Sequence, residues 1–183
     1  MASLPHMTSG LTDATLAELE ALEHEHPELG RIEVIDGALH ASGESAVGYL
    51  HQMVVQRLNL LLAAACPPGA LVVLDTWWTS HRGRIRPDLA LYRPADVPES
   101  LKAFRVPPWA TLEVLSDDAD HDLVRKDGIY ADFGVTRRAY VEPWGRYDWW
   151  CRLDGVPHAA PSAMWELPGW PPLTLERDAL LAR

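Results

Sequence analysis

The chain has 183 residues, 48% of them hydrophobic and 23% charged, which is the length and composition of an ordinary single globular domain. No apolar run approaches the roughly 20 residues that a membrane-spanning helix needs, and the first Lys or Arg is Arg31, so a basic signal-peptide start is excluded. The formal net charge of −10 counts against a protein that coats nucleic acid through its overall charge. Cys66 and Cys151 form no CxxC pair and indicate a reducing, cytoplasmic setting.

The N-terminal segment is predicted to be a tail followed by a short acidic helix. Residues 1–12 are expected to be flexible, and residues 13–183 are expected to form one domain. Leucines recur at helical spacing from Leu16 onward, and Pro27 cannot continue a helix. We therefore expect this helix to end just before Pro27.

A β-hairpin and the longest helix are predicted next. Asp36-Gly37 lies between two β-like runs, and this dipeptide is a strong signal for a tight hairpin turn. The sequence therefore predicts strands at 31–36 and 38–42. An apolar stripe at helical spacing predicts the longest helix at 45–66, ended by two prolines and a glycine.

The middle of the chain is predicted to supply the central strands and one more helix. Two β-like runs, 71–78 and 85–92, are joined by a basic loop at 80–84. A short apolar strand is expected at 111–115, and a helix at 116–133 that a glycine terminates.

The C-terminal third is predicted to finish the sheet and then lose regularity. Strands are expected at 139–141 and 148–153, and a short one around 164–167. From about residue 146 the chain is a Pro/Trp-rich extension of the domain, and its tryptophans are predicted to serve packing more than base stacking. Strands in the middle with helices between them predict an α/β (α+β) fold, with a mixed central sheet flanked by helices.

Five ionisable residues occupy positions that suggest a site. Asp88 opens a strand, and Glu113 lies inside the apolar strand 111–115, where a carboxylate is costly to bury unless it is paired, hydrogen-bonded or bound to a metal. Asp122, Lys126 and Tyr130 follow at four-residue spacing, which places them on one helix face. If that helix folds back along the sheet, Lys126 returns level with Glu113.

Two carboxylates with an ammonium suit metal-assisted hydrolysis of a phosphodiester. Carboxylate oxygens bind Mg²⁺ or Mn²⁺, and such an ion polarises the phosphate and activates a water molecule. A nearby lysine orients that water or stabilises the charge that develops on the phosphate.

The same positions belong to motifs that follow one another in a fixed order along residues 13–145. The motifs are Arg86-Pro87-Asp88, Leu112-Glu113-Val114-Leu115-Ser116 and Asp122-x-x-x-Lys126-x-x-x-Tyr130, with further marks at Glu33, His51 and Tyr140-Val141-Glu142-Pro143. The ordered set resembles the Uma-two family of restriction endonucleases, which belongs to the PD-(D/E)xK nuclease superfamily.

The resemblance implies a restriction-endonuclease-like core, DNA as substrate, Mg²⁺ (or Mn²⁺) as cofactor and a homodimer. It implies that Asp88 and Glu113 bind the metal, and that Glu33, His51 and Tyr130 support the site. The superfamily's usual lysine lies two residues after the glutamate, where this chain has Leu115. The resemblance therefore requires Lys126 to take the lysine's role.

Other interpretations of these residues stay open at this point. Asp88 is also a plausible turn cap, Glu113 a partner in a structural ion pair with Arg86, and Tyr130 a packing residue. Arg84 and Arg86 are expected to bind phosphate, because they belong to the only basic strip, which brackets Asp88. The strip consists of Arg82, Arg84, Arg86 and Arg93.

The sequence thus predicts a metal-dependent endonuclease that hydrolyses DNA. The alternative from another class is a catalytically inactive protein that keeps the nuclease fold for binding, which the acidic charge and Leu115 favour. A third hypothesis is a metal-free acid–base hydrolase of a small molecule.

Overall fold

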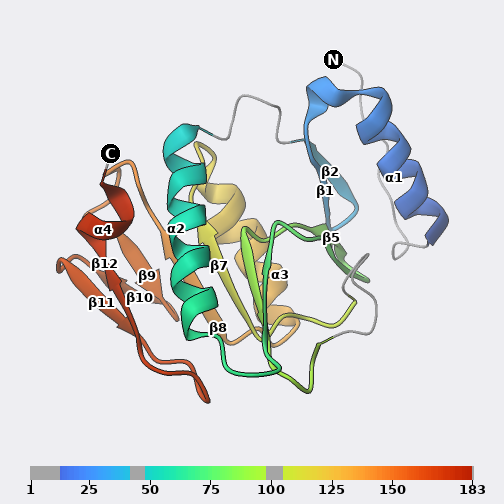
Figure 1. Cartoon of the computed structure of the whole chain (residues 1–183). Coiled ribbons are helices and arrows are strands. Elements are labelled where there is room, and N and C mark those ends of the chain that lie inside the picture. Colours follow the sequence, from blue (N-terminus) through green and yellow to red (C-terminus); the bar gives the residue numbers. More distant parts are fainter. Residues whose placement is uncertain (1–12, 42–47, 98–104, 183) are drawn as a thin grey trace.

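A six-stranded mixed sheet runs through the middle of the protein (Figure 1). The computed structural model describes residues 13–41, 48–97 and 105–182, so the predicted tail lies outside the described residues. In spatial order the strands are β10 (Val156–His158), β9 (Cys151–Leu153), β8 (Arg137–Val141), β7 (Ala110–Val114), β6 (Leu89–Tyr92) and β3 (Leu71–Leu74). Only β7 and β8 pair in parallel, and this confirms the predicted mixed sheet.

A smaller antiparallel sheet stands beside the first. Its strands, in spatial order, are β2 (Ala38–Ala41), β1 (Ile32–Ile35), β5 (Gly83–Ile85) and β4 (Trp78–Ser80). Asp36 and Gly37 both have positive φ angles, 50° and 78°, which is the backbone of the predicted tight turn between β1 and β2.

The predicted strands 71–78 and 85–92 are wrong, because each is broken and divided between the two sheets. The first break contains Asp75, whose φ is 51°, and the second contains Pro87, which has no N–H for a strand ladder. The expected basic loop is instead the β4–β5 hairpin. Asp88 therefore lies where the chain crosses from one sheet into the other.

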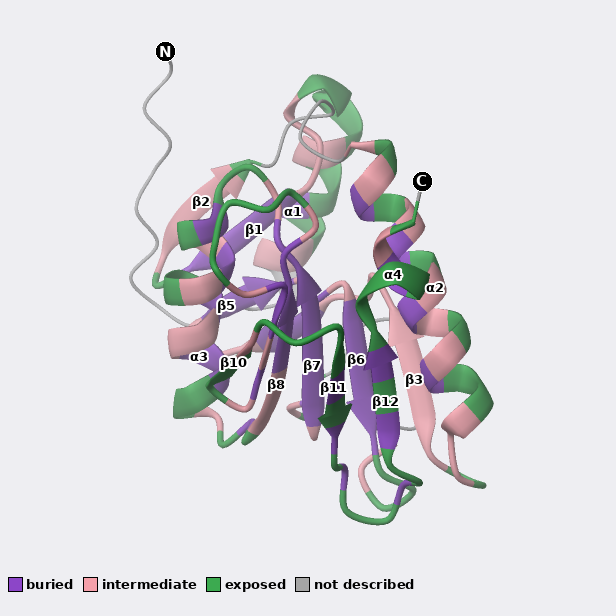
Figure 2. Ribbon diagram, turned by 90° about the vertical axis from the view of Figure 1, so that its left-hand side faces the viewer, coloured by how far each residue is buried: buried purple, intermediate pink, exposed green. Residues whose placement is uncertain are grey.

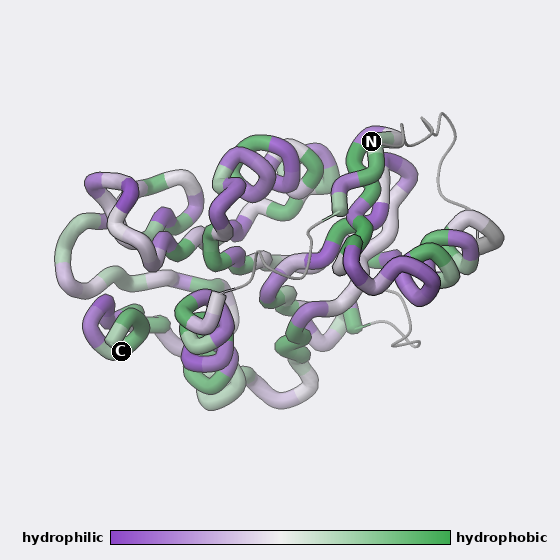
Figure 3. Tube along the Cα trace, turned by 90° about the horizontal axis from the view of Figure 1, so that it is seen from above, coloured by the Kyte–Doolittle hydropathy of each residue, from purple (hydrophilic) through white to green (hydrophobic). Residues whose placement is uncertain are grey.

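Helices cover both sheets. They are α1 (Asp13–Glu25), a 3₁₀ turn (Pro27–Leu29), α2 (Tyr49–Ala65), the π-helix η2 (His121–Lys126), α3 (Asp127–Asp132) and α4 (Arg177–Leu181). The turns of α2 carry both hydrophobic and hydrophilic residues (Figure 3), and Val54, Leu58 and Leu62 form its fully buried side. The helix predicted at 116–133 starts later and opens as a π-helix, which is often found at functional sites. No helix in the described ranges is long and apolar enough to cross a membrane.

The C-terminal segment is more regular than its composition predicts. Beyond β9 and β10 it forms a two-stranded sheet of β11 (Ser162–Trp165) and β12 (Leu173–Glu176). Trp150, Trp165 and Trp170 are buried in the same hydrophobic core as Val54 of α2. Figure 2 shows the main sheet buried along β6 and β7, with partly exposed residues along β3.

Gly83 is the glycine at which a side chain has least room. A Cβ at this position would collide with the backbone carbonyl of Val34 on the neighbouring strand β1. Gly128 in α3 offers a matched control, because a Cβ there would meet nothing within 4 Å.

We predict that Gly83→Ala lowers the free energy of unfolding by about 3 kcal/mol, the upper end of the usual overpacking cost, because backbone must move to admit the methyl group. Gly128→Ala should raise it by up to about 1 kcal/mol, the helix-propensity difference between the two residues. Urea unfolding monitored by circular dichroism measures both values. Equal effects of the two substitutions would contradict the close approach of the β1 and β5 backbones at Gly83.

Candidate functional site

A buried ammonium group stands among three carboxylates from three different elements. Lys126 Nζ at the end of η2 lies 3.4 Å from Glu33 Oε1 on β1 and 3.5 Å from Glu113 Oε2 on β7. It lies 3.3 Å from Asp122 Oδ1 one turn earlier, and it donates a hydrogen bond of 3.3 Å to the carbonyl of Arg86. The helix therefore folds back along the sheet, as the spacing required.

Burial and neighbouring charges shift the pKa values of this cluster. Burial alone would lower the pKa of Lys126, but the surrounding carboxylates, Glu113 first among them, raise it well above its usual range. Burial raises the pKa of Glu113 well above its usual range, and the charges of Asp88 and Asp122 add to this while Lys126 opposes it. Lys126 is therefore a fixed positive charge, and the carboxylates outnumber it.

Asp88 lies directly beside Glu113. The antiparallel ladder of β6 and β7 ends at the pair Leu89 and Leu112, the residues next to Asp88 and Glu113, and the Asp88 amide donates to Glu113 Oε2 at 3.2 Å. Asp88 Oδ2 accepts a hydrogen bond of 2.8 Å from the Val114 amide. The structure thus gives Asp88 more than a turn-capping contact: it holds the carboxylate against the central strand.

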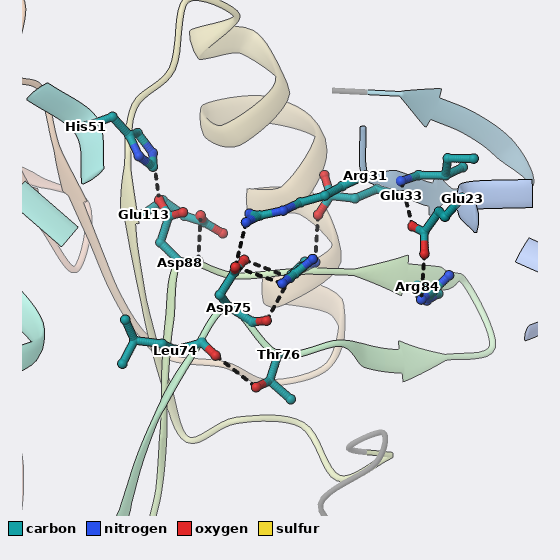
Figure 4. A network of polar contacts seen from close by, with 12 residues as sticks. Glu23, Arg31, Glu33, His51, Leu74, Asp75, Thr76, Arg84, Asp88 and Glu113 are labelled. Atoms are coloured by element: carbon teal, nitrogen blue, oxygen red, sulfur yellow. Dashed lines mark hydrogen bonds and ion pairs between the residues drawn. The ribbon is translucent and has the colours of Figure 1, made fainter. Parts of the chain in front are cut away.

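His51 on α2 approaches Asp88 from the other side, with Nε2 3.2 Å from Asp88 Oδ2 (Figure 4). Burial lowers the pKa of His51, but the hydrogen bond and charge of Asp88 outweigh it and leave the pKa raised. His51 Nδ1 is buried, and among the described residues it has no hydrogen-bond partner. His51 therefore contributes one donor to Asp88.

Tyr130 is both a packing residue and a hydrogen-bond donor. Its ring stacks on Trp78 at a centroid distance of 6.0 Å, and its hydroxyl donates to Glu113 Oε1 at 2.5 Å. Glu113 is thus held at one oxygen by Tyr130 and at the other by the Asp88 amide and Lys126.

Glu33 brings in a residue that the sequence analysis missed. Its Oε1 accepts a hydrogen bond of 2.6 Å from the Arg86 amide, and its Oε2 lies 2.5 Å from His121 Nε2. Burial opposes ionisation of Glu33, but Lys126 and His121 outweigh it, so its pKa is lowered. The only sequence signal for His121 was its place on the same helix face as Arg125, one residue before Asp122.

These side chains line one cavity of about 430 Å³. Its interior carries Glu33, His51, Asp88, Glu113, Asp122 and Lys126. Around them the lining includes Arg31, Arg86, His40 and Arg125, together with the exposed Asp117 and Asp118. The structure therefore brings Asp88, Glu113, Lys126, Glu33 and His51 to one pocket, with Tyr130 bound to Glu113 behind it.

The predicted basic strip has a different arrangement. Its four arginines each pair with a carboxylate: Arg82 with Asp36 and Asp132, Arg84 with Glu23, Arg86 with Asp75, and Arg93 with Asp96. Figure 4 shows Arg84 joined to Glu23. Arg84 is 2% exposed, stacks on Trp77 and lies outside the pocket lining, which argues against the phosphate-binding role expected of it. Arg86 does line the pocket, but it and Arg31 share Asp75.

The donor set fits a hard divalent cation. Asp88 and Glu113 offer adjacent carboxylate oxygens, and Mg²⁺ is usually held by one or two carboxylates while it keeps several waters. Within the described residues, no group of three or more His, Cys, Asp or Glu side chains is arranged to hold a metal. The fit therefore rests on two carboxylates and the excess negative charge around Lys126.

Comparison with known proteins identifies the family of the chain. The sequence profile of the family Uma2, described as "Putative restriction endonuclease", matches residues 16–176. The chain belongs to the Uma2 family. This membership supports a nuclease.

A solved structure gives the fold independently. The chain is similar to "a putative nuclease belonging to DUF820" from Anabaena variabilis, with a TM-score of 0.64 and 17% sequence identity over 83% of this chain and 90% of that one. At this identity the likeness shows the fold alone. No curated protein matches the chain significantly.

We predict that Lys126→Met lowers the free energy of unfolding by about 3 kcal/mol near pH 8, because removal of one partner from a buried ion pair leaves uncompensated charge. The pKa values of Glu113 and Asp122 are raised in the folded protein, so their contribution to stability is present at low pH and is lost as the pH rises through those values. The deficit should therefore be smaller at pH 5 than at pH 8.

Urea titrations at the two pH values measure this difference. Arg177→Met is the control, because Arg177 is an exposed cation on α4 that lies outside the pocket lining. A deficit of the same size at both pH values would show that Lys126 contributes packing and not charge.

Proposed function

We propose that the protein is a metal-dependent endonuclease that hydrolyses DNA phosphodiester bonds. The observation that carries the proposal is the contact of a buried, protonated Lys126 with Glu113, beside Asp88, in one open pocket. Membership of the Uma2 family supports the same reaction class.

In this proposal Asp88 and Glu113 hold Mg²⁺ or Mn²⁺. Such an ion, when bound, supplies Lewis acidity to the phosphate and lowers the pKa of an attacking water. The residues around the pair fix its two carboxylates: the Val114 amide and His51 fix Asp88, and Tyr130 fixes Glu113. Their role is preorganisation, which spares the site a rearrangement during reaction.

Lys126 acts in this proposal as a charged donor and not as a general base. Because the surrounding carboxylates raise its pKa, it keeps its proton at neutral pH. Its ammonium can therefore donate a hydrogen bond to a water or to a phosphate oxygen, and it stabilises negative charge that develops there. Glu33 and Asp122 hold the ammonium level with Glu113.

A catalytically inactive nuclease-fold protein that binds nucleic acid is the alternative. One observation favours it: the ammonium of Lys126 has three N–H donors, and four oxygen atoms of the protein already surround it at 3.3 to 3.5 Å, so a water or phosphate would have to displace one of these contacts. Cleavage of bound DNA distinguishes the endonuclease from the inactive binding protein. The homodimer and the cytoplasmic location stay predictions from the sequence.

We predict that the wild-type protein cleaves plasmid DNA with Mg²⁺ or Mn²⁺ and that EDTA abolishes cleavage. Asp88→Asn, Glu113→Gln and Lys126→Met should each lower the rate by about 10²-fold or more, the usual cost of removing a group that stabilises transition-state charge. Calorimetry with Mn²⁺ should show weaker binding for Asp88→Asn and Glu113→Gln.

Glu166→Gln is the control, because it removes an exposed carboxylate that lies outside the pocket lining. It should leave both cleavage and Mn²⁺ binding unchanged. DNA binding without cleavage under every metal condition would favour the inactive alternative. Cleavage that survives EDTA would contradict the metal-dependent mechanism.

A further inference from the structure

We propose that Arg125, oriented by His40, binds a backbone phosphate of the DNA strand next to the phosphate that is cleaved. This inference rests on the proposed function and adds to it the side of the pocket along which the strand runs. It also replaces the predicted role of Arg84, whose side chain is buried against Trp77 and Glu23.

Arg125 differs in its partners from the other basic side chains that line the pocket, His40 aside. The others are engaged by carboxylates: Arg31 and Arg86 by Asp75, His51 by Asp88, His121 by Glu33, and Lys126 by Glu33, Glu113 and Asp122. Arg125 is exposed and has no carboxylate partner among the described residues, and its contact is a hydrogen bond of 3.3 Å to His40 Nδ1. Its charge is therefore available to an incoming anion.

The contact with His40 fixes both the hydrogen-bond roles and the position of Arg125. A guanidinium can only donate, so Arg125 Nη1 donates and His40 Nδ1 accepts, which places the proton of a neutral His40 on Nε2. Burial lowers the pKa of His40, and the nearby His121 and Arg125 lower it further, which agrees with a neutral ring. His40 is thus a positioning residue that leaves the remaining guanidinium donors free.

The β1–β2 hairpin and η2 bring these groups to one rim of the pocket. His40 is the register partner of Glu33, so both side chains lie on one face of the hairpin. His121 bonds to Glu33, and its ring lies 5.4 Å from that of His40. Arg125 and Lys126 both line the pocket, so a phosphate on Arg125 lies at the rim of the cavity in which Lys126 faces Glu113.

The pocket lining also carries exposed acidic residues, and one of them, Asp118, accepts a hydrogen bond of 3.2 Å from the amide of His121, close to His40. Asp117 and Asp118 line the pocket and are exposed. A phosphodiester chain is repelled by these carboxylates and attracted by Arg125. In a chain with a net charge of −10, an incoming phosphate is therefore expected to contact the guanidinium of Arg125, which no carboxylate among the described residues neutralises.

The test compares the DNA affinity of Arg125→Ala and Arg177→Ala, which remove the same charge from exposed positions inside and outside the pocket lining. Binding of a labelled duplex is measured by fluorescence anisotropy against salt concentration, with Ca²⁺ in place of Mg²⁺. Arg125→Ala should weaken binding about tenfold, as expected for one charge-assisted contact, and reduce the salt slope by about 0.9. Arg177→Ala should change neither.

Two further variants test the role of His40. His40→Leu should weaken binding while the salt slope stays at the wild-type value, because the charge of Arg125 remains but its orientation is lost. His40→Asn should restore the affinity, since its side-chain carbonyl also accepts a hydrogen bond. Equal weakening by both substitutions would remove His40 from the proposal.

The remaining outcomes distinguish failure of the phosphate site from failure of the proposed function. If wild type binds and cleaves DNA but Arg125→Ala behaves like Arg177→Ala, the phosphate site is overturned and the proposed function stands. If wild type neither binds nor cleaves DNA with Mg²⁺, Mn²⁺ or Ca²⁺, the proposed function is overturned and the phosphate site with it.

Discussion

The site depends on one constraint: a single buried ammonium must offset several carboxylates that the fold holds together. Glu33, Glu113 and Asp122 come from two sheets and a helix, and each lies within 3.5 Å of Lys126 Nζ. Ionised carboxylates are costly to bury unless they are paired. The helix that carries Lys126 must therefore pack on this sheet, because its ammonium compensates the buried negative charge. The negative charge that remains is what the proposed function assigns to a divalent cation.

The crossing of the chain between the two sheets is the second structural requirement. Asp75 and Pro87 end ladder pairing at the points where the chain leaves one sheet for the other. The same crossing places the Arg86 amide on Glu33 and the Asp88 amide on Glu113. The breaks that made the strand prediction wrong therefore bring Glu33 of the small sheet close to Glu113 of the large sheet.

The residue spacing along strands and helices was enough to predict part of the site. Contacts between residues far apart in the sequence could not be predicted in this way. Strand rise and helix rise indicated that Lys126 returns level with Glu113, and the residue types indicated hard-metal chemistry. The partner of Arg84 could not be predicted, because Glu23 is 61 residues away and meets it only after the small sheet has formed. His121 was missed for the same reason, since Glu33 is 88 residues away.

The C-terminal strands show a different limit of sequence reasoning. Prolines and exposed polar residues hide a short alternating pattern, so only one short strand, around residues 164–167, was predicted in an otherwise irregular extension. In the structure Ala163, Trp165, Leu173 and Leu175 point into the core that α2 shares. Their burial stabilises the strand–helix layer behind the pocket, and that contact is invisible until both segments are placed.

Leu115 explains how a nuclease fold can take its lysine from a helix. It stands two residues after Glu113, so it shares the face of the sheet on which Glu113 and Tyr140 lie. Leu115 is fully buried and packs with Ala119 and Tyr140, and Leu123 of η2 packs against the same group. The space that a strand lysine would need is filled by this apolar contact, which holds η2 against the sheet. The helix then brings Lys126 to within 3.5 Å of Glu113 Oε2. In the proposed function Lys126 takes the place of the usual lysine, and Leu115, the residue that departs from the usual pattern, holds its helix in position.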